Sequence, residues 1–479
     1  MKDKLNLTML TDFYEITMAN GYLEHNLENQ IVCFDMFFRK VPDGGGFAIM
    51  LGLEQLIDYI KNLKFNEEDI EYLKSKKIFG EKFLNYLKNF KFTANVWAVR
   101  EGTPIFPNEP IVKVIGPAIE AQFIETMVLL TINHQSLIGT KTNRIVRAAQ
   151  GRAVLEFGSR RAQGPHGAIN GARAAYIAGC AGTACTISDI MYKTPATGTM
   201  AHSWIQMFPT EYDAFMAYAK TYPENCILLI DTYNVLKSGL PNAIKVFKEY
   251  LVPNGYMSGG VRIDSGDITY LSKKVREELD KAGLEHIKIV ASNSLDEYII
   301  RDLINQGAKI DSFGVGERLI TSKSEPVFGG VYKLTSIFKD GVEIPKIKLS
   351  ENVGKITTPC SKKLVRLYSK DNGKAIADVL MLEGEPLPDG SDYEIFDPEH
   401  TWKRKTVTNY YAENLLIKIF DKGKCIYDSP DIEQIRQYCN EQIDTLWDEV
   451  KRFENPHTYY VDLSPQLWKI KNDLLNEYK

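Results

Sequence analysis

The 479-residue chain lacks the features that mark several specialised classes of protein. It has only seven cysteines and no C-x-x-C pair, and Cys180 and Cys185 lie within a run of small residues. This spacing argues against a zinc knuckle or a disulfide framework and fits a reducing cytoplasm. No apolar run reaches the length of a membrane span, and the acid-containing N-terminus has no apolar signal core. We therefore expect a cytoplasmic protein without a membrane partner.

An excess of positive charge is also missing. The formal net charge is −4, which provides no electrostatic reason to expect binding to nucleic acid. The glycines of Asp43-Gly44-Gly45-Gly46 do not match G-x-G-x-x-G, so no dinucleotide fingerprint is indicated. There is no internal repeat, and the composition, 44% hydrophobic and 25% charged, is ordinary for a globular protein. The length allows two or three domains.

The segment 154–204 is the richest in candidate functional residues. An apolar run of strand length, 153–157, ends at Gly158 and is followed at once by Arg160 and Arg161. A Gly/Pro-rich turn, 164–167, then leads into a predicted helix over 168–178. Guanidinium groups and free helix N–H groups both favour anions, above all phosphate or carboxylate. The plain alternative is a solvated or salt-bridged arginine pair.

About thirty residues later, a second polar loop holds Thr197, Thr199 and His202. A histidine in such a loop is commonly an ordinary surface or core residue. Further strand ends downstream that finish in polar, glycine-containing turns favour a functional interpretation of both loops.

A strand-then-helix pattern runs from residue 153 to about 330. The predicted strands are 153–157, 183–187, 226–231, 260–264, 287–292 and 310–315, and the predicted helices are 168–178, 212–220, 241–250, 270–282 and 295–306. Continuous apolar strands suit a parallel sheet that is buried on both faces. The pattern allows a doubly wound sheet or a (β/α) barrel, and the similar character of the loops favours the barrel.

The flanking regions have a different, mixed pattern. Before residue 150 we expect a helix over 8–22, a strand over 31–39, helices within 49–90, short strands over 94–116 and a long helix over 119–150. After residue 330 we expect strands over 331–338, 345–350, 363–369 and 374–382, and helices near 431–451 and 464–478. The predicted domains are 1–150, a barrel over 151–330, and 331–479, which completes the first.

The ends of the predicted barrel strands are polar. They carry Asp231-Thr232-Tyr233-Asn234, Asp264-Ser265-Gly266-Asp267, Ser292-Asn293-Ser294 and Gly316-Glu317-Arg318. Active sites of barrels lie at the carboxyl ends of the strands, so these turns would converge on one face. Glycine-containing turns provide phosphate cradles, and an aspartate there suits a sugar diol. The alternative for Asp-Ser-Gly-Asp is a helix cap.

These residues describe a site for a phosphorylated ribose and a small anionic ring, and the chain resembles the nicotinate phosphoribosyltransferase family over nearly its whole length. The resemblance lies in TDFYEITMANGY, FDMFFRKVPDGGGFAIMLGLE, EFGSRRAQGPHGA, GTMAHSW, LIDTYN, GVRIDSGD, VASNSLDE and FGVGERL, in the family's order. It implies an incomplete (β/α) barrel with an α/β domain that is built from N- and C-terminal segments. It also implies a homodimer whose active sites take residues from both subunits.

The resemblance implies a set of roles for individual residues. Tyr14 and Phe157 would sandwich the pyridine ring, while Thr199 and Arg262 would hold the nicotinate carboxylate. Asp264 would take the ribose hydroxyls and Arg160 a phosphate of the donor. The phosphate cradle would comprise Ser292, Asn293, Gly316 and Glu317, and His202 would be the phosphorylated histidine of an ATP-coupled cycle.

The implied reaction transfers 5-phosphoribosyl from 5-phosphoribosyl diphosphate to nicotinate, with ATP as co-substrate, in NAD biosynthesis. We expect Mg²⁺ to be held largely by the diphosphate, so no residue is predicted as a metal ligand. The chain departs from the family pattern at Glu317, where a phosphate contact is expected, and at Cys360, where a glycine is expected after Pro359. Two alternatives stay open at this point: a nicotinamide-using relative, and a non-catalytic phosphate-binding scaffold.

Overall fold

The computed structural model describes residues 6–477, which form two compact units. Of the described residues, 6–137 and 327–477 form one unit, and 138–326 form the other. The boundary lies inside helix α6 (Glu125–Ala148) rather than after it at residue 150. Within residues 6–477, no helix is both long and apolar enough to cross a lipid bilayer.

The first unit is built on a seven-stranded sheet that both ends of the chain supply. Its order is β13 (Val342–Pro345), β12 (Val331–Lys339), β1 (Ile31–Phe37), β5 (Val112–Pro117), β3 (Asn95–Val99), β19 (Leu416–Asp421) and β20 (Lys424–Cys425). The N-terminal strand β1 pairs with the C-terminal β12, and β3 pairs with β19, all antiparallel. The apolar sequence of β1 buries six of its seven residues, which places the strand in the centre of the core.

This unit also contains three smaller sheets and seven helices of the described residues. A four-stranded sheet has the order β18 (Tyr410–Asn414), β14 (Lys362–Ser369), β15 (Ala375–Leu382), β21 (Val461–Leu463), and two short pairs join β2 (Ala48–Ile49) to β4 (Pro104–Ile105) and β16 (Tyr393–Phe396) to β17 (Arg404–Val407). The helices are α1 (Phe13–Glu24), α2 (Leu53–Asn62), α3 (Glu67–Ser75), α4 (Glu81–Lys88), α5 (Ala118–Phe123), α15 (Ile432–Asp444) and α16 (Pro465–Glu477).

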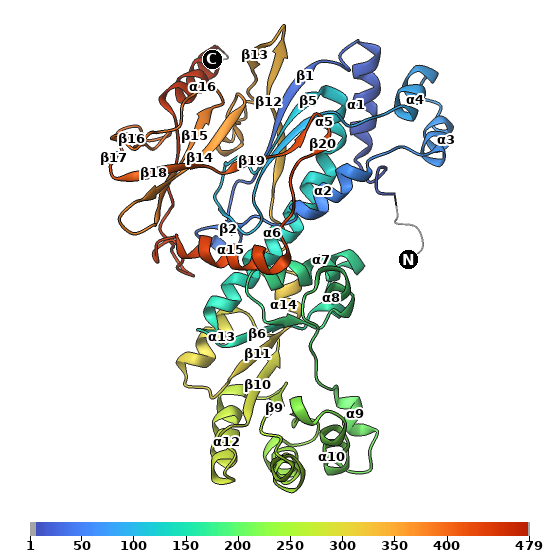
Figure 1. The fold of residues 1–479 in the computed structure, drawn as a ribbon, viewed down its shortest axis with the longest axis vertical. Helices are drawn as coiled ribbons and strands as arrows, with labels where there is room; N and C mark the ends of the chain where they lie inside the picture. The colour runs from blue at the N-terminus through green and yellow to red at the C-terminus, as the bar shows by residue number, and fades with distance from the viewer. Residues whose placement is uncertain (1–5, 478–479) are drawn as a thin grey trace. The chain divides into compact units, whose positions relative to one another are not determined.

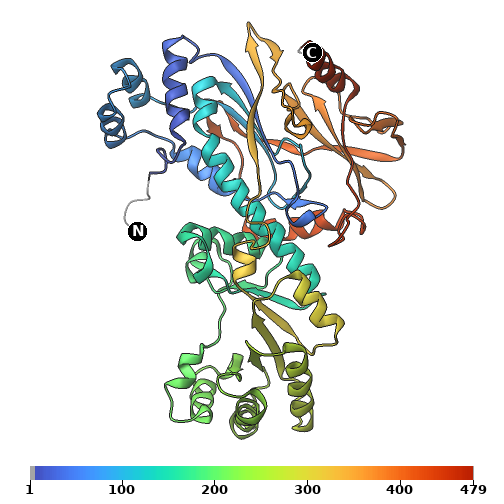
Figure 2. The same cartoon turned by 180° about the vertical axis from the view of Figure 1, so that it is seen from behind.

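The second unit is a parallel sheet that does not close. Its order is β7 (Gly182–Thr183), β6 (Ala153–Glu156), β11 (Ser312–Val315), β10 (Lys288–Asn293), β9 (Gly259–Ile263) and β8 (Cys226–Leu229), so β7 and β8 are edge strands. In Figures 1 and 2, β9, β10 and β11 run side by side, and α12 (Ile268–Lys281) lies against β9 and β10. Its other helices are α7 (Gly164–Ile177), α8 (Thr186–Tyr192), α9 (His202–Gln206), α10 (Glu211–Thr221), α11 (Leu240–Val246), α13 (Glu297–Asn305) and α14 (Glu317–Ile320). The predicted fold class, an incomplete barrel with a domain from both chain ends, is confirmed.

Several predicted elements were wrong in extent. The expected strand 183–187 ends at Thr183, because the Thr183 hydroxyl accepts the Cys185 N–H and α8 begins at Thr186. The expected turn 164–167 is the first turn of α7, where Pro165 is tolerated since an N–H there has no helical partner. Residues 346–350 extend no strand beyond Pro345, and the helix expected to reach 451 ends at Asp444.

Three helices also differ at their ends or middles. The first helix begins at Phe13 rather than at residue 8, since the Thr8 hydroxyl accepts the Lys64 N–H and donates to its carbonyl. The long helix expected over 119–150 is divided at Ile124 into α5 and α6. The helix expected over 241–250 continues from α11 into π-helical turns up to Leu251.

Cys360, which departs from the family pattern, lies in the left-handed backbone region with φ of 72°. Glycine adopts this conformation freely, whereas a residue with a Cβ bears a cost of about 1–2 kcal/mol. The buried Cys360 therefore has a backbone conformation that favours glycine, the residue expected here from the resemblance.

Candidate active site

Two aspartates are linked at the carboxyl ends of β8 and β9. The carboxylate of Asp231 accepts the backbone N–H of Asp264 at 3.1 Å and the hydroxyl of Ser265 at 2.6 Å, both through Oδ2. Asp264 in turn accepts the hydroxyl of Ser292, from the end of β10, at 2.5 Å. The cap of α12 is a different residue, Asp267, whose side chain accepts the Tyr270 N–H. The helix-cap alternative therefore belongs to Asp267, and Asp264 presents its carboxylate at the strand ends.

His202 lies beside these carboxylates, at the start of α9. Its Nδ1 is 3.1 Å from the hydroxyl of Thr232, and its Nε2 is 3.9 Å from Oδ2 of Asp264. The side chains of His202 and Asp264 are 41% and 39% exposed, so both can meet a ligand from solvent.

Arg262 is held in place within β9 by the loop that precedes α9. Its guanidinium donates to the Thr199 hydroxyl at 2.5 Å and to the Met200 carbonyl at 2.9 Å, one bond from each terminal nitrogen. Burial lowers the pKa of Arg262, and the charges of Asp264 and Asp231 oppose this shift. A buried Nε has no hydrogen-bond partner among the described residues. The pair Thr199 and Arg262, predicted from the sequence, is thus in direct contact.

Phe157 lies over the glycine-containing end of β11. A Cβ added to Gly314 would stand only 2.6 Å from the Phe157 ring, so glycine is required for the ring to occupy this position. The N–H of Phe157 donates to the Val315 carbonyl at 2.8 Å, which continues the pairing of β6 with β11.

A buried glutamate anchors the loop that carries Phe157 and the paired arginines. Glu156 is fully buried; it accepts the Gly158 N–H and, at 2.5 Å, the Thr183 hydroxyl. Burial raises the pKa of the Glu156 carboxyl. These bonds join the ends of β6 and β7 and thereby fix the start of the arginine loop.

The arginine pair divides between two environments. Arg160 is exposed, and its charge contributes to lowering the pKa of Arg262, so it lies within electrostatic reach of that residue. The Nε of Arg161 is 3.9 Å from the carboxylate of Glu317, which also binds Lys323 at 2.7 Å. The Glu317 carboxylate is therefore engaged by cations, and its backbone N–H belongs to the first residue of α14.

The remaining cradle residues are Asn293, the last residue of β10, and Gly316, which follows β11. Asn293 has a φ of 148°, and its own side chain accepts the next N–H, from Ser294, at 2.6 Å. Gly316 precedes α14, and a Cβ there would approach the Phe157 carbonyl at 3.0 Å. The turns after both strands therefore place backbone close to the site.

Tyr14 lies in the other unit, on α1, so the second unit by itself contains every predicted site residue except this one. It is 44% exposed, and partial burial together with the Glu125 carboxylate raises the pKa of its hydroxyl.

Four residues of the site, Glu156, Thr183, Thr232 and Gly314, have no role predicted from the sequence. Thr232 and Gly314 lie in polar strand ends next to residues with predicted roles, and this position is the signal that could identify them. No signal marked Glu156, because an acid at the end of an apolar run is equally typical of an exposed strand terminus.

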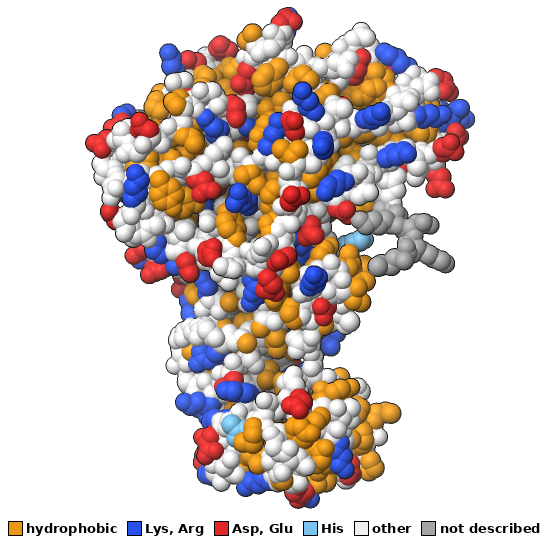
Figure 3. Space-filling view, viewed as in Figure 1, with side chains coloured by type: hydrophobic (Ala, Val, Ile, Leu, Met, Phe, Trp, Pro, Cys, Tyr) orange, Lys and Arg blue, Asp and Glu red, His pale blue; other side chains and the backbone are white. Residues whose placement is uncertain are grey.

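The strand ends contain two guanidinium groups, an aromatic ring, a carboxylate that could bind a sugar diol, and an imidazole; they belong to Arg160, Arg262, Phe157, Asp264 and His202. This set can bind a phosphorylated sugar and a planar anion, and the imidazole can accept a phosphoryl group. On the face drawn in Figure 3, acidic and basic side chains are interspersed rather than gathered by sign.

Comparisons with known proteins agree on one family. Residues 9–133 match the model of the nicotinate phosphoribosyltransferase N-terminal domain, and residues 361–471 match that of its C-terminal domain. The chain is 41% identical to the nicotinate phosphoribosyltransferase of Bacillus subtilis over 99% of this chain and 96% of that protein. It is 38% identical to a nicotinate phosphoribosyltransferase of Mycobacterium tuberculosis, with 96% and 92% covered.

Solved structures are similar over nearly the whole chain. The human nicotinic acid phosphoribosyltransferase superposes with a TM-score of 0.84 at 27% identity, covering 98% of this chain and all of that one. A nicotinate-nucleotide pyrophosphorylase from Pyrococcus furiosus, 23% identical, has a TM-score of 0.71 with 93% and 97% covered, which shows a shared fold.

Proposed function

The chain belongs to the nicotinate phosphoribosyltransferase family, and from this we propose that it transfers the 5-phosphoribosyl group of 5-phosphoribosyl diphosphate to nicotinate. The observation that carries the proposal is the meeting of Arg262, Asp264, Ser292 and His202 at the ends of adjacent parallel strands. The relatives' name and this set of side chains favour a transferase over a scaffold protein.

Arg262 would select the substrate. Each terminal nitrogen of its guanidinium carries a second hydrogen beyond those bound to Thr199 and Met200, and these would meet the nicotinate carboxylate. A hydrogen bond to a charged group contributes about 1.5–3 kcal/mol, against about 0.5–1.5 for a neutral one. Arg262 therefore favours nicotinate over the neutral nicotinamide.

In the transfer itself, the pyridine nitrogen forms a bond to C1 of the ribose while the C1–oxygen bond to diphosphate breaks. The bonding electron pair leaves with the diphosphate, and the carbon passes through an oxocarbenium-like state. Asp264 would hold the ribose hydroxyls, Phe157 would support the ring, and Arg160 with the cradle Ser292, Asn293, Gly316 and Glu317 would hold phosphates. The protein thus contributes positioning and charge neutralisation.

We also propose coupling to ATP through His202. An imidazole nitrogen would attack the terminal phosphorus, ADP would leave with the electrons of the broken bond, and water would later release phosphate. The described residues contain no group of three or more His, Cys, Asp or Glu side chains placed to hold a metal. Mg²⁺ would enter on the diphosphate, which supplies the oxygen ligands that this ion prefers. There, Mg²⁺ would neutralise charge on the leaving group.

A homodimer and a cytoplasmic location complete the proposal. An exposed apolar face on and before α1, with Leu10, Phe13, Tyr14 and Met18 each at least 37% exposed, supports a partner subunit that receives Tyr14. The seven free cysteines support a reducing compartment.

One experiment tests the function directly. The purified protein is incubated with Mg²⁺ and 5-phosphoribosyl diphosphate, with nicotinate or nicotinamide, with and without ATP, and the products are separated by chromatography. Nicotinate mononucleotide, diphosphate, ADP and phosphate are expected. Nicotinamide mononucleotide as the main product, or no nucleotide at all, would contradict the proposal.

A further inference from the structure

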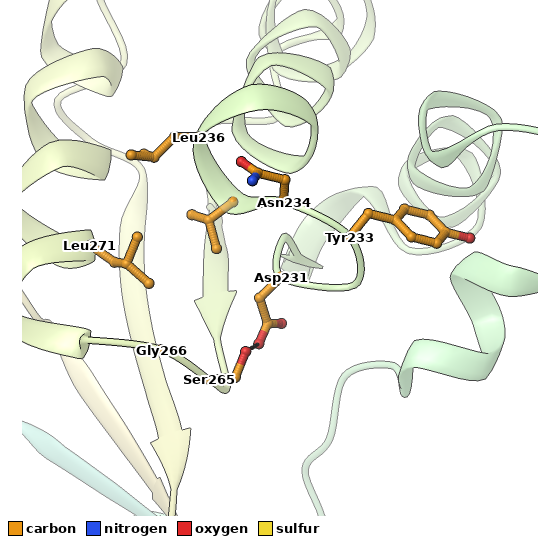
Figure 4. A pocket seen from close by; sticks show the side chains of 8 residues that line it. Asp231, Tyr233, Asn234, Leu236, Ser265, Gly266 and Leu271 are labelled. Carbon is orange, nitrogen blue, oxygen red and sulfur yellow. Dashed lines mark hydrogen bonds between the residues drawn. The ribbon is translucent and has the colours of Figure 1, made fainter.

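Side-chain hydrogen bonds join neighbouring turns at the carboxyl ends of the parallel strands. Figure 4 shows one of them, from Ser265 after β9 to Asp231 after β8, beside a recess of about 280 Å³. The segments at the ends of β10 and β11, which contain the proposed phosphate cradle, are joined by a different bond. The guanidinium of Arg318, the second residue of α14, donates to the carboxylate of Asp296, the residue before α13.

The carboxylate of Asp296 has two separate sets of partners. Its Oδ1 accepts the N–H groups of Tyr298 at 3.1 Å and Ile299 at 2.9 Å, and thereby caps α13. Its Oδ2 accepts from Nη1 of Arg318, whose buried Nε has no partner among the described residues. The side chain of Asp296 is 13% exposed, so the ion pair is largely shielded from water. It therefore differs from a fully exposed ion pair, which contributes little.

The residue after Asp296 fixes the start of α13 to another helix. Glu297 is buried, and its carboxylate binds Lys141 at 2.8 Å and Arg144 at 2.9 Å, both on α6. The start of α13 is thus firmly held, and Arg318 ties α14 to it.

The ion pair spans the two halves of the phosphate cradle. Asn293, the last residue of β10, lies opposite Val315 in the parallel pairing of β10 with β11. Asp296 follows Asn293 by three positions, and Arg318 follows Val315 by three. The Arg318–Asp296 bond therefore continues the alignment of the two strands beyond their last paired residues.

We propose that Arg318 and Asp296 are positioning residues that hold the two halves of the phosphate cradle at the spacing that the ribosyl donor requires. The inference rests on the proposed function, in which the cradle holds phosphates of 5-phosphoribosyl diphosphate. Without the ion pair, the two segments would move independently, and the donor would have to order them when it binds. This cost would be subtracted from the binding free energy, so the donor would bind more weakly.

Donor binding tests the proposal without relying on turnover. The probe is 5-phosphoribosyl diphosphate with Mg²⁺ and without ATP, and binding is measured by isothermal titration calorimetry. Asp296→Asn keeps an oxygen that caps α13, because asparagine caps helices about as well as aspartate, but it removes the charge that pairs with Arg318. Asp296→Asn and Arg318→Ala should each raise the donor Kd about tenfold, as expected for the loss of one charge-assisted hydrogen bond.

A double variant tests whether the two residues act as a pair. Asp296→Asn combined with Arg318→Ala should raise the Kd no further than either single change, because both remove the same bond. Arg318→Ala leaves the cap of α13 untouched, so it decides the question if Asp296→Asn does not fold.

A purely structural role would lower stability without changing donor binding. Arg276→Ala is the matched control, because the Arg276 side chain is 18% exposed and its guanidinium donates to Asp280 at 2.7 Å and to the carbonyls of Leu284 and Ile287. It should lower the melting temperature, as the ion-pair variants do, but leave the donor Kd within about twofold of the unmutated value. In initial-rate assays, Arg318→Ala should raise the KM for the donor and leave the KM for nicotinate unchanged.

The outcomes separate this role from the proposed function. A Kd equal to that of the unmutated protein in Arg318→Ala, or additive effects that reach about a hundredfold in the double variant, would overturn the role of the ion pair and leave the proposed function intact. If the unmutated protein does not bind the donor at all, the proposed function is wrong and this role is wrong with it.

Discussion

Substitution of Asp264 can distinguish a catalytic role from a structural one, because Asp267, three residues further on in the same turn, provides a control. Asp264→Asn keeps the shape of the side chain and an oxygen for the Ser292 hydroxyl, now 2.5 Å from Oδ1. It removes the charge that would hold the ribose hydroxyls. Replacing a charged acceptor by a neutral one weakens each hydrogen bond by about 1–1.5 kcal/mol, so two hydroxyls lose about 2–3 kcal/mol.

This loss converts to a fall of about 30- to 150-fold in kcat/KM for 5-phosphoribosyl diphosphate. If the contact strengthens in the transition state, kcat should fall more than donor binding weakens. Initial rates with varied donor, measured with and without ATP, check both statements.

Asp267→Asn is the control in the same turn. Asp267 caps α12 through the Tyr270 N–H at 2.9 Å, and asparagine caps helices about as well as aspartate. Activity should therefore stay within about twofold of the unmutated value. A kcat/KM for Asp264→Asn within about threefold of the unmutated protein would refute the reasoning, since it would leave no energy for a diol contact.

Four further outcomes are expected. Arg262→Ala should raise the KM for nicotinate at least about tenfold in initial-rate assays, because the charge-assisted contact is lost; equal use of nicotinate and nicotinamide by the unmutated protein would contradict this. His202→Ala should abolish ATP hydrolysis and acid-labile labelling from γ-labelled ATP while slow ATP-independent transfer remains, whereas persistent label would assign the role to another residue. Mixing Tyr14→Ala with His202→Ala protein should restore part of the activity if subunits share sites, and no rescue under proven subunit exchange would place Tyr14 elsewhere. Burial, and to a lesser extent the Asp397 charge, raises the pKa of Asp462 in the folded protein from 3.8 to about 7. The unfolded chain therefore loses this proton first, and the free energy of unfolding falls as the pH rises from 3.8 to about 7. Urea denaturation should therefore show Asp462→Asn stabilising the protein more at pH 8 than at pH 5, and an equal effect at both would exclude this cause.

Much of the barrel half could be predicted because its strands are continuous apolar runs. The runs at 226–231, 260–264, 287–292 and 310–315 correspond to β8, β9, β10 and β11 within a few residues. A strand buried on both faces has to be apolar throughout, so its sequence is recognisable without knowledge of its neighbours. The prediction of a strand over 183–187 was wrong because the Cys185 N–H donates to the Thr183 hydroxyl and the strand ends there, and strand propensity does not include such a bond.

The local sequence also indicated which turns contain functional residues, but not which residue of a turn faces the site. In Asp264-Ser265-Gly266-Asp267, both aspartates had the right type and position for a helix cap. Only the folded chain shows that Asp267 accepts the helix N–H while Asp264 faces Ser292 and His202. Glu156 could not be recognised for the same reason, since its partner Thr183, 27 positions away, is brought to it by the pairing of β6 with β7.

The sequence by itself determined the alternating pattern of the barrel, the polar ends of its strands and the family motifs, because each depends on residues that are close together in the chain. The tertiary structure alone decided the contact between Thr199 and Arg262, which are 63 positions apart, and the pairing of β1 with β12 across some three hundred residues. It also decided that a recess opens beside Asp231. Such contacts arise from the packing of whole strands and helices, and a short stretch of sequence contains no record of which distant stretch will lie against it.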